Sequence, residues 1–297
     1  MPSSVTMPSS VTMPMGQAAS RPQTAANRYY RRFGLFERVM HAGLMFSFVG
    51  CALSGLPLLF PYTGWAKTVA ALMGGFHGAA LVHRVCAAIM CVVFVTHILQ
   101  FLWIGLAKGT LLSVLWGPNS LMPQGKDIVD IYQHMKYFLG KGPRPQFDRY
   151  TYWEKFDYMA VFWGMFIIGG SGLLLWFAIP LSAWLPGWIF NIATLVHGEE
   201  ALLAVGFIFT IHFFNGHVRP EKFPMDMVIF TGRISDHELR EERPLEYQRL
   251  VREGRLAAIE ATPPAPGAVM FGRIVGGTAL VLGILTVVLI VYGLVMR

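Results

Sequence analysis

Five histidines lie inside long apolar stretches of this sequence, where a polar ring is costly and needs a reason. They are His41, His83, His97, His197 and His212, out of nine histidines in the chain. Imidazole within a membrane segment is rare and usually functional. A hydrogen bond between helices can explain one such histidine but is a poor explanation for five. We therefore expect these side chains to act as ligands.

The spacing of these histidines indicates two binding sites at two depths. His83 and His97 are 14 residues apart, and His197 and His212 are 15 residues apart. In an α-helix both spacings return to within about 60° of the same face, with about 21 Å between the side chains. Two stacked sites closed by imidazoles suit two b-type haems with bis-histidine ligation. Zinc is the alternative metal, but it normally takes four clustered ligands.

Five apolar stretches can hold these residues across a bilayer, since a spanning helix needs about 20 residues. The chain has 297 residues, of which 54% are hydrophobic and 14% charged. An ordinary soluble domain has about 25% charged residues, so a soluble fold and a nucleic-acid-binding domain are excluded. The sequence predicts an all-α polytopic membrane protein, a four-helix haem-binding bundle with an additional fifth transmembrane helix. The expected spans are 36–60, 79–106, 158–179, 188–216 and 269–296.

Four regions follow from this pattern. Residues 1–27 begin with two tandem copies of MPSSVT, at 1–6 and 7–12, and lack the apolar core of a secretory signal peptide. We expect these 27 residues to be disordered. Residues 28–216 form the four-helix membrane domain with a cytoplasmic loop at 107–157. Residues 217–267 form a second cytoplasmic segment, and residues 268–297 form the fifth helix.

Shorter elements can also be predicted from local signals. Apolar residues at helical spacing over 127–139 predict a helix along the membrane surface. Ser235 and Pro244 each mark the start of a short helix. In the fifth span, Gly272 and Gly276 have the spacing of a helix-packing face.

The basic residues predict the orientation. Twenty lysines and arginines lie around the start of the first span, between spans two and three, or between spans four and five, while the other two loops hold only Lys67. Cytoplasmic loops carry the excess of positive charge. We therefore expect a cytoplasmic N-terminus and a C-terminus outside.

This orientation assigns each histidine to a depth. His83 and His197 lie near the outer surface and form an unambiguous pair. His41, His97 and His212 lie near the cytoplasm, which is one ligand too many for one haem. His212 is a ligand of the inner haem under both possible assignments. Its partner is either His41 or His97, and geometry alone does not choose between them. A third haem on the spare histidine is a further alternative.

Two other features bear on the cofactor. Arg84, next to His83, either pairs with a haem propionate or extends to the outer interface. Cys51, Cys86 and Cys91 lie in apolar stretches without CxxC spacing. A disulfide framework, a thiolate zinc site and attachment of c-type haem are therefore unsupported.

Several stretches resemble one family of membrane cytochromes. Phe36-Glu-Arg-Val-Met-His41, followed by Ala52-Leu-Ser-Gly55, resembles the first span of formate dehydrogenase gamma subunits and of the related cytochrome b subunits of nickel-iron hydrogenases. Leu81-Val-His-Arg84 falls at the family's second-span ligand. Leu195-Val-His197 and Ile211-His212 match the remaining two ligands, and the resemblance extends over about 31–250.

The resemblance has consequences for ligands and partners. It implies that His83 and His197 hold the outer b-type haem and that His41 and His212 hold the inner one, which favours His41 over His97. It also implies a bacterial inner-membrane subunit that passes electrons between an outer-face iron–sulfur partner and quinone, an exchangeable substrate near the inner haem.

The chain departs from the family in two places. Where the family has Tyr-Asn-x-Gly-Gln-Lys at its quinone site, this sequence reads Tyr150-Thr-Tyr-Trp-Glu-Lys155, without the asparagine and the glycine. The segment from Asn215 to Asp226 is closer to cytochromes b that serve multihaem c-type cytochromes, so the partner is an iron–sulfur or a multihaem c-type subunit. The quinone-site candidates are Tyr150, Glu154, Lys155 and His217.

The sequence therefore predicts a di-haem electron-transfer subunit of a respiratory oxidoreductase complex, with no catalytic residues of its own. Its partners are membrane lipid, quinone and the outer-face redox subunit, and not nucleic acid. Two other classes stay open. One is a stand-alone transmembrane haem reductase with a soluble donor. The other is a non-redox membrane anchor or transporter that binds no haem.

Overall fold

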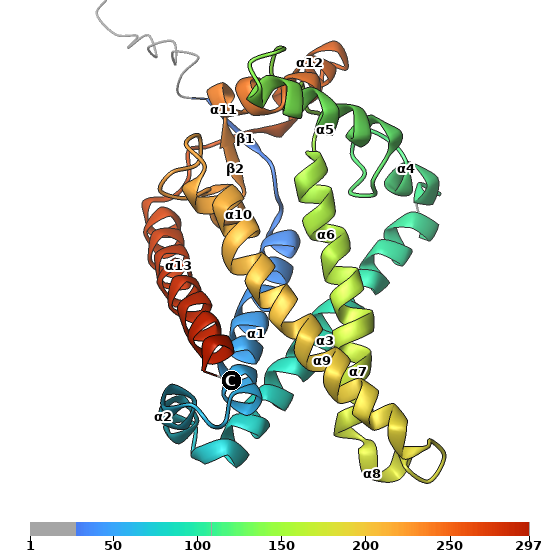
Figure 1. Cartoon of the computed structure of the whole chain (residues 1–297). Helices are drawn as coiled ribbons and strands as arrows, with labels where there is room; N and C mark the ends of the chain where they lie inside the picture. The colour runs from blue at the N-terminus through green and yellow to red at the C-terminus, as the bar shows by residue number, and fades with distance from the viewer. Residues whose placement is uncertain (1–27, 108, 297) are drawn as a thin grey trace, which may run out of the picture.

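The computed structural model describes residues 28–107 and 109–296, and five long helices dominate it (Figure 1). They agree closely with the predicted spans, so an all-α multi-pass membrane protein is confirmed at this level. The predicted disorder of residues 1–27 lies outside the described residues. The five helices, all long and apolar enough to cross a membrane, are Leu35–Leu59, Gly75–Ala107, Tyr152–Trp176, Gly187–Val218 and Pro266–Val295.

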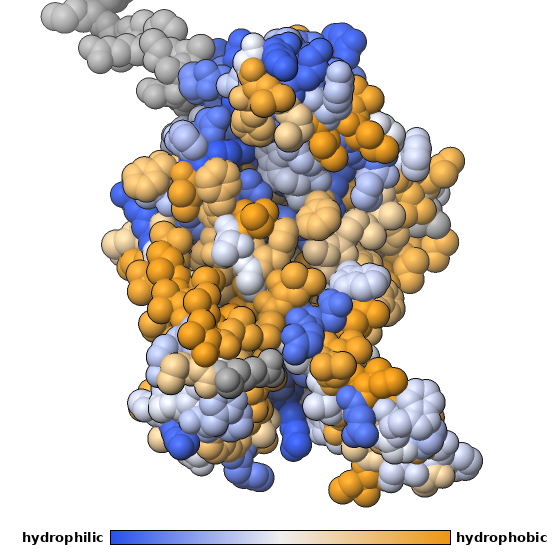
Figure 2. Space-filling model, in the orientation of Figure 1, coloured by the Kyte–Doolittle hydropathy of each residue, from blue (hydrophilic) through white to orange (hydrophobic). Residues whose placement is uncertain are grey.

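The outward faces of these helices are apolar. Leu99, Trp103, Trp163 and Val281 each expose 60% or more of their surface. Figure 2 shows apolar side chains over the middle of the molecule and more polar side chains towards its two ends. A continuous apolar surface of this extent is unfavourable in water and favourable against lipid chains.

Two of the spans are interrupted by π-helical turns, which are rare and occur often at functional sites. The third span is divided into α6, η2 and α7, and the fourth into α9, η3 and η4. Both interruptions lie near histidines predicted as ligands. The bounds are α6 Tyr152–Gly164, η2 Met165–Gly169, α7 Gly170–Trp176, α9 Gly187–Phe207, η3 Ile208–His212 and η4 Phe214–Val218.

The first span, α1 (Leu35–Leu59), packs closely along the second, α3 (Gly75–Ala107). A Cβ added at Gly43 would lie 2.8 Å from Val93 Cγ2, so only glycine allows this approach. Small residues at a helix interface let two backbones come close, which is how helices gain packing energy within lipid.

The fifth span, α13 (Pro266–Val295), also packs through glycine. Gly272 and Gly276 are buried, as the sequence predicts. A Cβ at Gly272 would lie 2.6 Å from Met227 Cε, and one at Gly276 would lie 2.8 Å from Met225 Sδ. The additional helix is therefore fitted against the rest of the protein.

A polar cap covers one end of the helices, the upper end in Figure 1. It contains a three-stranded antiparallel sheet in the order β2-β1-β3, which the sequence analysis does not predict. β1 (Tyr29–Arg31) lies between β2 (Arg233–Ser235) and β3 (Glu260–Ala261). The Tyr30 hydroxyl donates to Asp236 Oδ1 at 3.0 Å, and burial together with this bond raises the pKa of Tyr30 to about 12.

Short helices complete the two ends. Ser235 caps α11 through the Glu238 backbone N–H and Pro244 begins α12, as predicted. The helix predicted over 127–139 is α5, whose apolar side chains are exposed; its placement on a membrane surface stays a prediction. The cap contains α4 Leu111–Leu115, α5 Gly125–Phe138, α10 Val228–Thr231, α11 Asp236–Glu242, α12 Pro244–Arg252 and η5 Ala257–Ile259; the opposite end contains α2 Gly64–Leu72 and α8 Ala178–Leu181.

Candidate functional site

His83 and His197, here called the lower pair, come together between α3 and α9. Their ring centroids are 6.0 Å apart and the ring planes are nearly perpendicular, at 85°. The sequence predicts this pairing from two separate helices. The structure brings the two side chains together as predicted.

The two rings of the lower pair are held in the same way. His83 Nδ1 lies 3.1 Å from the carbonyl oxygen of Cys51, and His197 Nδ1 lies 2.9 Å from the carbonyl oxygen of Ile168. A carbonyl oxygen only accepts hydrogen bonds, so each Nδ1 carries the proton and donates it. In a neutral imidazole this arrangement leaves Nε2 as the nitrogen with the free lone pair. A metal-ligating histidine typically has this second interaction.

A Ser-Gly dipeptide supports each ring. Ser54 Oγ lies 3.4 Å from His83 Nδ1, and Ser171 Oγ lies 3.4 Å from His197 Nδ1. A Cβ added at Gly55 or at Gly172 would lie 2.9 Å from the Cε1 atom of the adjacent imidazole. In both spans the carbonyl, the serine and the glycine occupy positions i, i+3 and i+4. The lower pair is thus an internal repeat, which the sequence analysis does not identify.

The Nε2 atoms of the lower pair are the atoms that could hold a metal, since Nδ1 of each ring lies against a backbone carbonyl. Among the described residues, no group of three or more His, Cys, Asp or Glu side chains is placed to hold one ion. Two-ligand sites suit haem, which brings four further nitrogen ligands of its own, better than zinc.

The upper cluster consists of His41, His97 and His212, near the cap. His212 Nδ1 lies 2.9 Å from Asp157 Oδ2, and His41 interacts electrostatically with His212. His97 Nε2 instead lies 2.9 Å from the Tyr158 hydroxyl. His212 Nδ1 therefore has a carboxylate partner, while one nitrogen of His97 has a hydroxyl partner.

The second oxygen of the Asp157 carboxylate is left unbonded by the residues that the structure describes. Asp157 Oδ1 is buried and makes no hydrogen bond with any residue that the structure describes. Asp157 and Tyr158 adjoin each other on α6 and contact two different histidines of the upper cluster. Neither residue is among the predicted site residues, although a carboxylate at the start of a span is a usable signal.

Arg84 lies beside the lower pair but faces outward. Its guanidinium carbon is 5.9 Å from the centre of the Trp176 ring, and its side chain is exposed. This position is compatible with both roles considered for it, the propionate partner and the interfacial side chain.

Two of the four quinone-site candidates have structural partners. Glu154 completes the capping box of α6 with Thr151 and forms an ion pair with Arg243 at 2.8 Å. Lys155 forms a buried ion pair with Asp127 at 2.9 Å, which fastens α5 to α6. Both side chains are therefore occupied in joining the cap to the third span.

The other two candidates make different contacts. The Tyr150 ring lies 5.5 Å from the guanidinium carbons of Arg32 and of Arg149. His217 packs against Phe213 at 5.1 Å, and its Nδ1 is buried without a hydrogen-bond partner among the described residues. No hydrogen bond or ion pair joins His217 to the other three candidates within the described part of the chain.

Comparison with known protein-family models and with curated protein sequences finds no match to this chain.

Proposed function

We propose that this chain is a di-haem b-type membrane cytochrome, similar to formate dehydrogenase gamma subunits, that moves electrons between the quinone pool and a redox partner. The observation that carries the proposal is the matched setting of His83 and His197. Both rings are held through Nδ1, a glycine lies against each ring, and the two ring centroids are 6.0 Å apart. When bound, haem supplies one-electron redox chemistry that these side chains lack.

The upper haem is assigned to His41 and His212. The Asp157 carboxylate accepts the Nδ1 proton of His212, which orients this ring and increases its basicity as a ligand. His97 is assigned a supporting role with Tyr158, because a ring nitrogen that bonds a hydroxyl is less free to bind iron.

The direction across the membrane follows from charge. The basic segments form the cap, and positive segments stay on the cytoplasmic side. In this orientation the lower pair lies near the outer face of a bacterial inner membrane, where an iron–sulfur or multihaem c-type subunit exchanges electrons with it. Arg84 is the proposed partner of a haem propionate there.

Quinone is proposed to bind near the upper cluster. Support comes from the buried, unpartnered Nδ1 of His217, since a buried polar atom without a partner points to a ligand or water. Tyr150 supplies a hydroxyl, while Glu154 and Lys155 support the site through their ion pairs. His217 and Asp157 are the candidate proton carriers.

The first test is a reduced-minus-oxidised optical spectrum of the purified chain, with a pyridine haemochrome count. We expect two b-type haems per chain. A folded preparation that contains none after growth with ample haem would overturn the proposal in favour of an anchor or transporter. One haem would remove the upper assignment, and three would restore His97 as a ligand.

A second test concerns quinone. Oxidised protein in vesicles is mixed with a water-insoluble quinol, and haem reduction is followed by absorbance. We expect reduction that slows in His217→Ala, with His237→Ala as the control, because the His237 side chain is 73% exposed on the cap. Reduction by a soluble donor alone, without quinol, would instead indicate a stand-alone reductase.

A further inference from the structure

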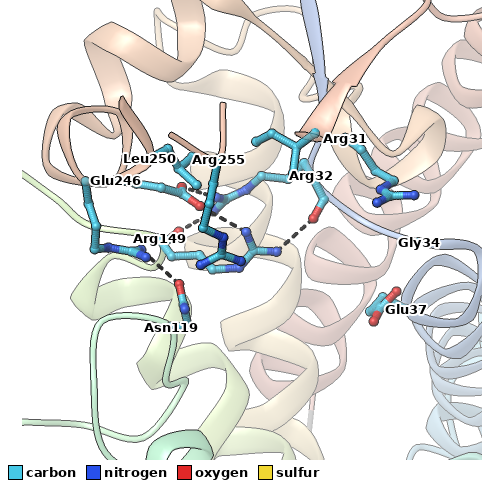
Figure 3. A pocket seen from close by; sticks show the side chains of 11 residues that line it. Arg31, Arg32, Gly34, Glu37, Asn119, Arg149, Glu246, Leu250 and Arg255 are labelled. Carbon is cyan, nitrogen blue, oxygen red and sulfur yellow. Dashed lines mark hydrogen bonds and ion pairs between the residues drawn. The ribbon is translucent and has the colours of Figure 1, made fainter. Parts of the chain in front are cut away.

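A cavity of about 450 Å³ lies in the cap, between β1, the start of α1 and α12 (Figure 3). This volume is within the range of small-ligand sites. Five of the residues around it are arginines, which come from three separate parts of the chain: Arg31, Arg32, Arg149, Arg249 and Arg255.

The negative charges around the cavity do not balance these arginines. Among the described residues, the acids that line it are Glu37 and Glu246 alone. Glu246 is shared, because it accepts from Arg32 through one oxygen and from Arg149 at 2.9 Å through the other. Asp148 and Glu253 lie outside the cavity and pair with two of its arginines. The arginines outnumber the acids even when these two carboxylates are counted.

Part of the arginine donor capacity is unused. The Arg31 guanidinium makes no hydrogen bond or ion pair with any residue that the structure describes. Arg249 Nε is buried and has no partner among those residues. Arg255 bonds only Glu253, at 3.0 Å, and its side chain is 59% exposed. Guanidinium groups with free donors match the oxygens of a phosphate, which they bind in pairs.

The cavity lies at the level where the first span begins. Gly34 and Glu37 line the cavity. Between them lies Leu35, the first residue of the membrane-spanning helix α1, whose surface is 71% exposed. A lipid headgroup occupies this depth, and basic pockets at the cytoplasmic ends of spans bind acidic headgroups.

We infer that this arginine-lined cavity binds a phosphate-bearing anion, and that its occupant is the headgroup of an acidic phospholipid. The buried pairs of Arg32 and Arg149 with Glu246 form the fixed wall of the site. Arg31 and Arg255, which take no part in that wall, supply the adjustable donors. The haem ligands are not involved, so this inference stands apart from the proposed electron transfer.

The test uses the full chain in vesicles of phosphatidylcholine with and without phosphatidylglycerol. Lipid retained after extraction is counted by native mass spectrometry for the wild type and for the double variant Arg31→Gln, Arg255→Gln. Two charged hydrogen-bonding groups are lost, so we expect phosphatidylglycerol retention to fall about tenfold or more. Arg252→Gln is the matched control, since Arg252 is exposed on α12 but does not line the cavity.

The outcomes separate the two sources of phosphate. Retention that depends on Arg31 and Arg255 and resists millimolar inorganic phosphate supports the lipid headgroup. Binding of inorganic phosphate that depends on Arg31 and Arg255, without retention of phosphatidylglycerol by the wild type, supports the anion site but overturns the headgroup as its occupant. Equal retention in the double variant and in Arg252→Gln overturns the inference altogether. The haem count of each variant is measured in the same samples, and we expect it to be unchanged.

Discussion

The lower pair and the upper cluster use the same side chain but fix it with different chemistry. Both rings of the lower pair donate to backbone carbonyls, which do not titrate at any working pH. In the upper cluster, His212 faces a carboxylate and His97 faces a phenol. A carboxylate or a phenol exchanges protons, whereas a carbonyl does not. Under the proposed function, the lower site is therefore suited to electron transfer alone, and the upper site to electron transfer coupled to protons.

Loss of a lower ligand should have the largest effect. We expect His83→Ala and His197→Ala each to reduce the haem count from two to one, because a haem site closed by two rings fails when either ring is removed. The double variant should lose no more than either single variant. His77→Ala is the control, since that histidine is exposed near the start of α3. Loss of different haems in the two single variants would show that His83 and His197 do not bind the same haem.

The upper cluster should respond asymmetrically. We expect His41→Ala to remove one haem and His97→Ala to retain both, because His97 Nε2 is engaged by Tyr158. The haemochrome count distinguishes the two results. The opposite result would make His97 the ligand of the upper haem, with His41 as the supporting residue.

The repeated glycine should matter at the lower site only. A methyl group at Gly172 would approach His197 Cε1 to 2.9 Å. Such overpacking costs about 1–3 kcal/mol. We therefore expect Gly172→Ala to release the lower haem at a lower temperature, with the upper haem unaffected. Gly170→Ala is the matched control, since nothing lies within 4 Å of a Cβ there. Equal effects of the two variants would show that the close fit to the imidazole is unimportant.

The smallest expected effect concerns the carboxylate at the upper site. Asp157→Asn keeps an oxygen near His212 but removes the charge, so we expect haem affinity at the upper site to fall about 10- to 100-fold. Its midpoint potential should rise in a redox titration, because the ligand becomes less electron-rich. The comparison variant Ser171→Ala should change little, since His197 keeps its bond to the Ile168 carbonyl. A shift confined to the lower haem in Asp157→Asn would contradict the assignment.

The sequence predicts the spans well because their signal is local and long. Twenty or more apolar residues, or a serine before a helix such as Ser235, can be recognised without knowledge of the rest of the chain. The three-stranded sheet escapes prediction because β1 covers only Tyr29–Arg31, too short to show a period of two, and its partners lie some 200 residues away in the sequence.

The histidine sites show the same limit. Helical spacing places His83 and His97 on one face of their own helix, but it does not say which neighbouring helix that face meets. Helical spacing therefore leaves the choice between His41 and His97 open, and the haem counts of the His41→Ala and His97→Ala variants decide it. The repeated Ser-Gly dipeptides at Ser54 and Ser171 are visible in the sequence, but they gain meaning only when each lies against an imidazole.

The order of strands in the cap determines when the protein can be completed during synthesis. β1 is the first described element of the chain, yet both of its neighbours come from residue 233 onward. The ribosome has therefore delivered four of the five spans to the membrane before β1 can find either partner. A nascent chain that stalls before Arg233 has its first four spans but lacks both partner strands of β1. The sheet of the cap therefore forms only when synthesis of the chain is nearly complete.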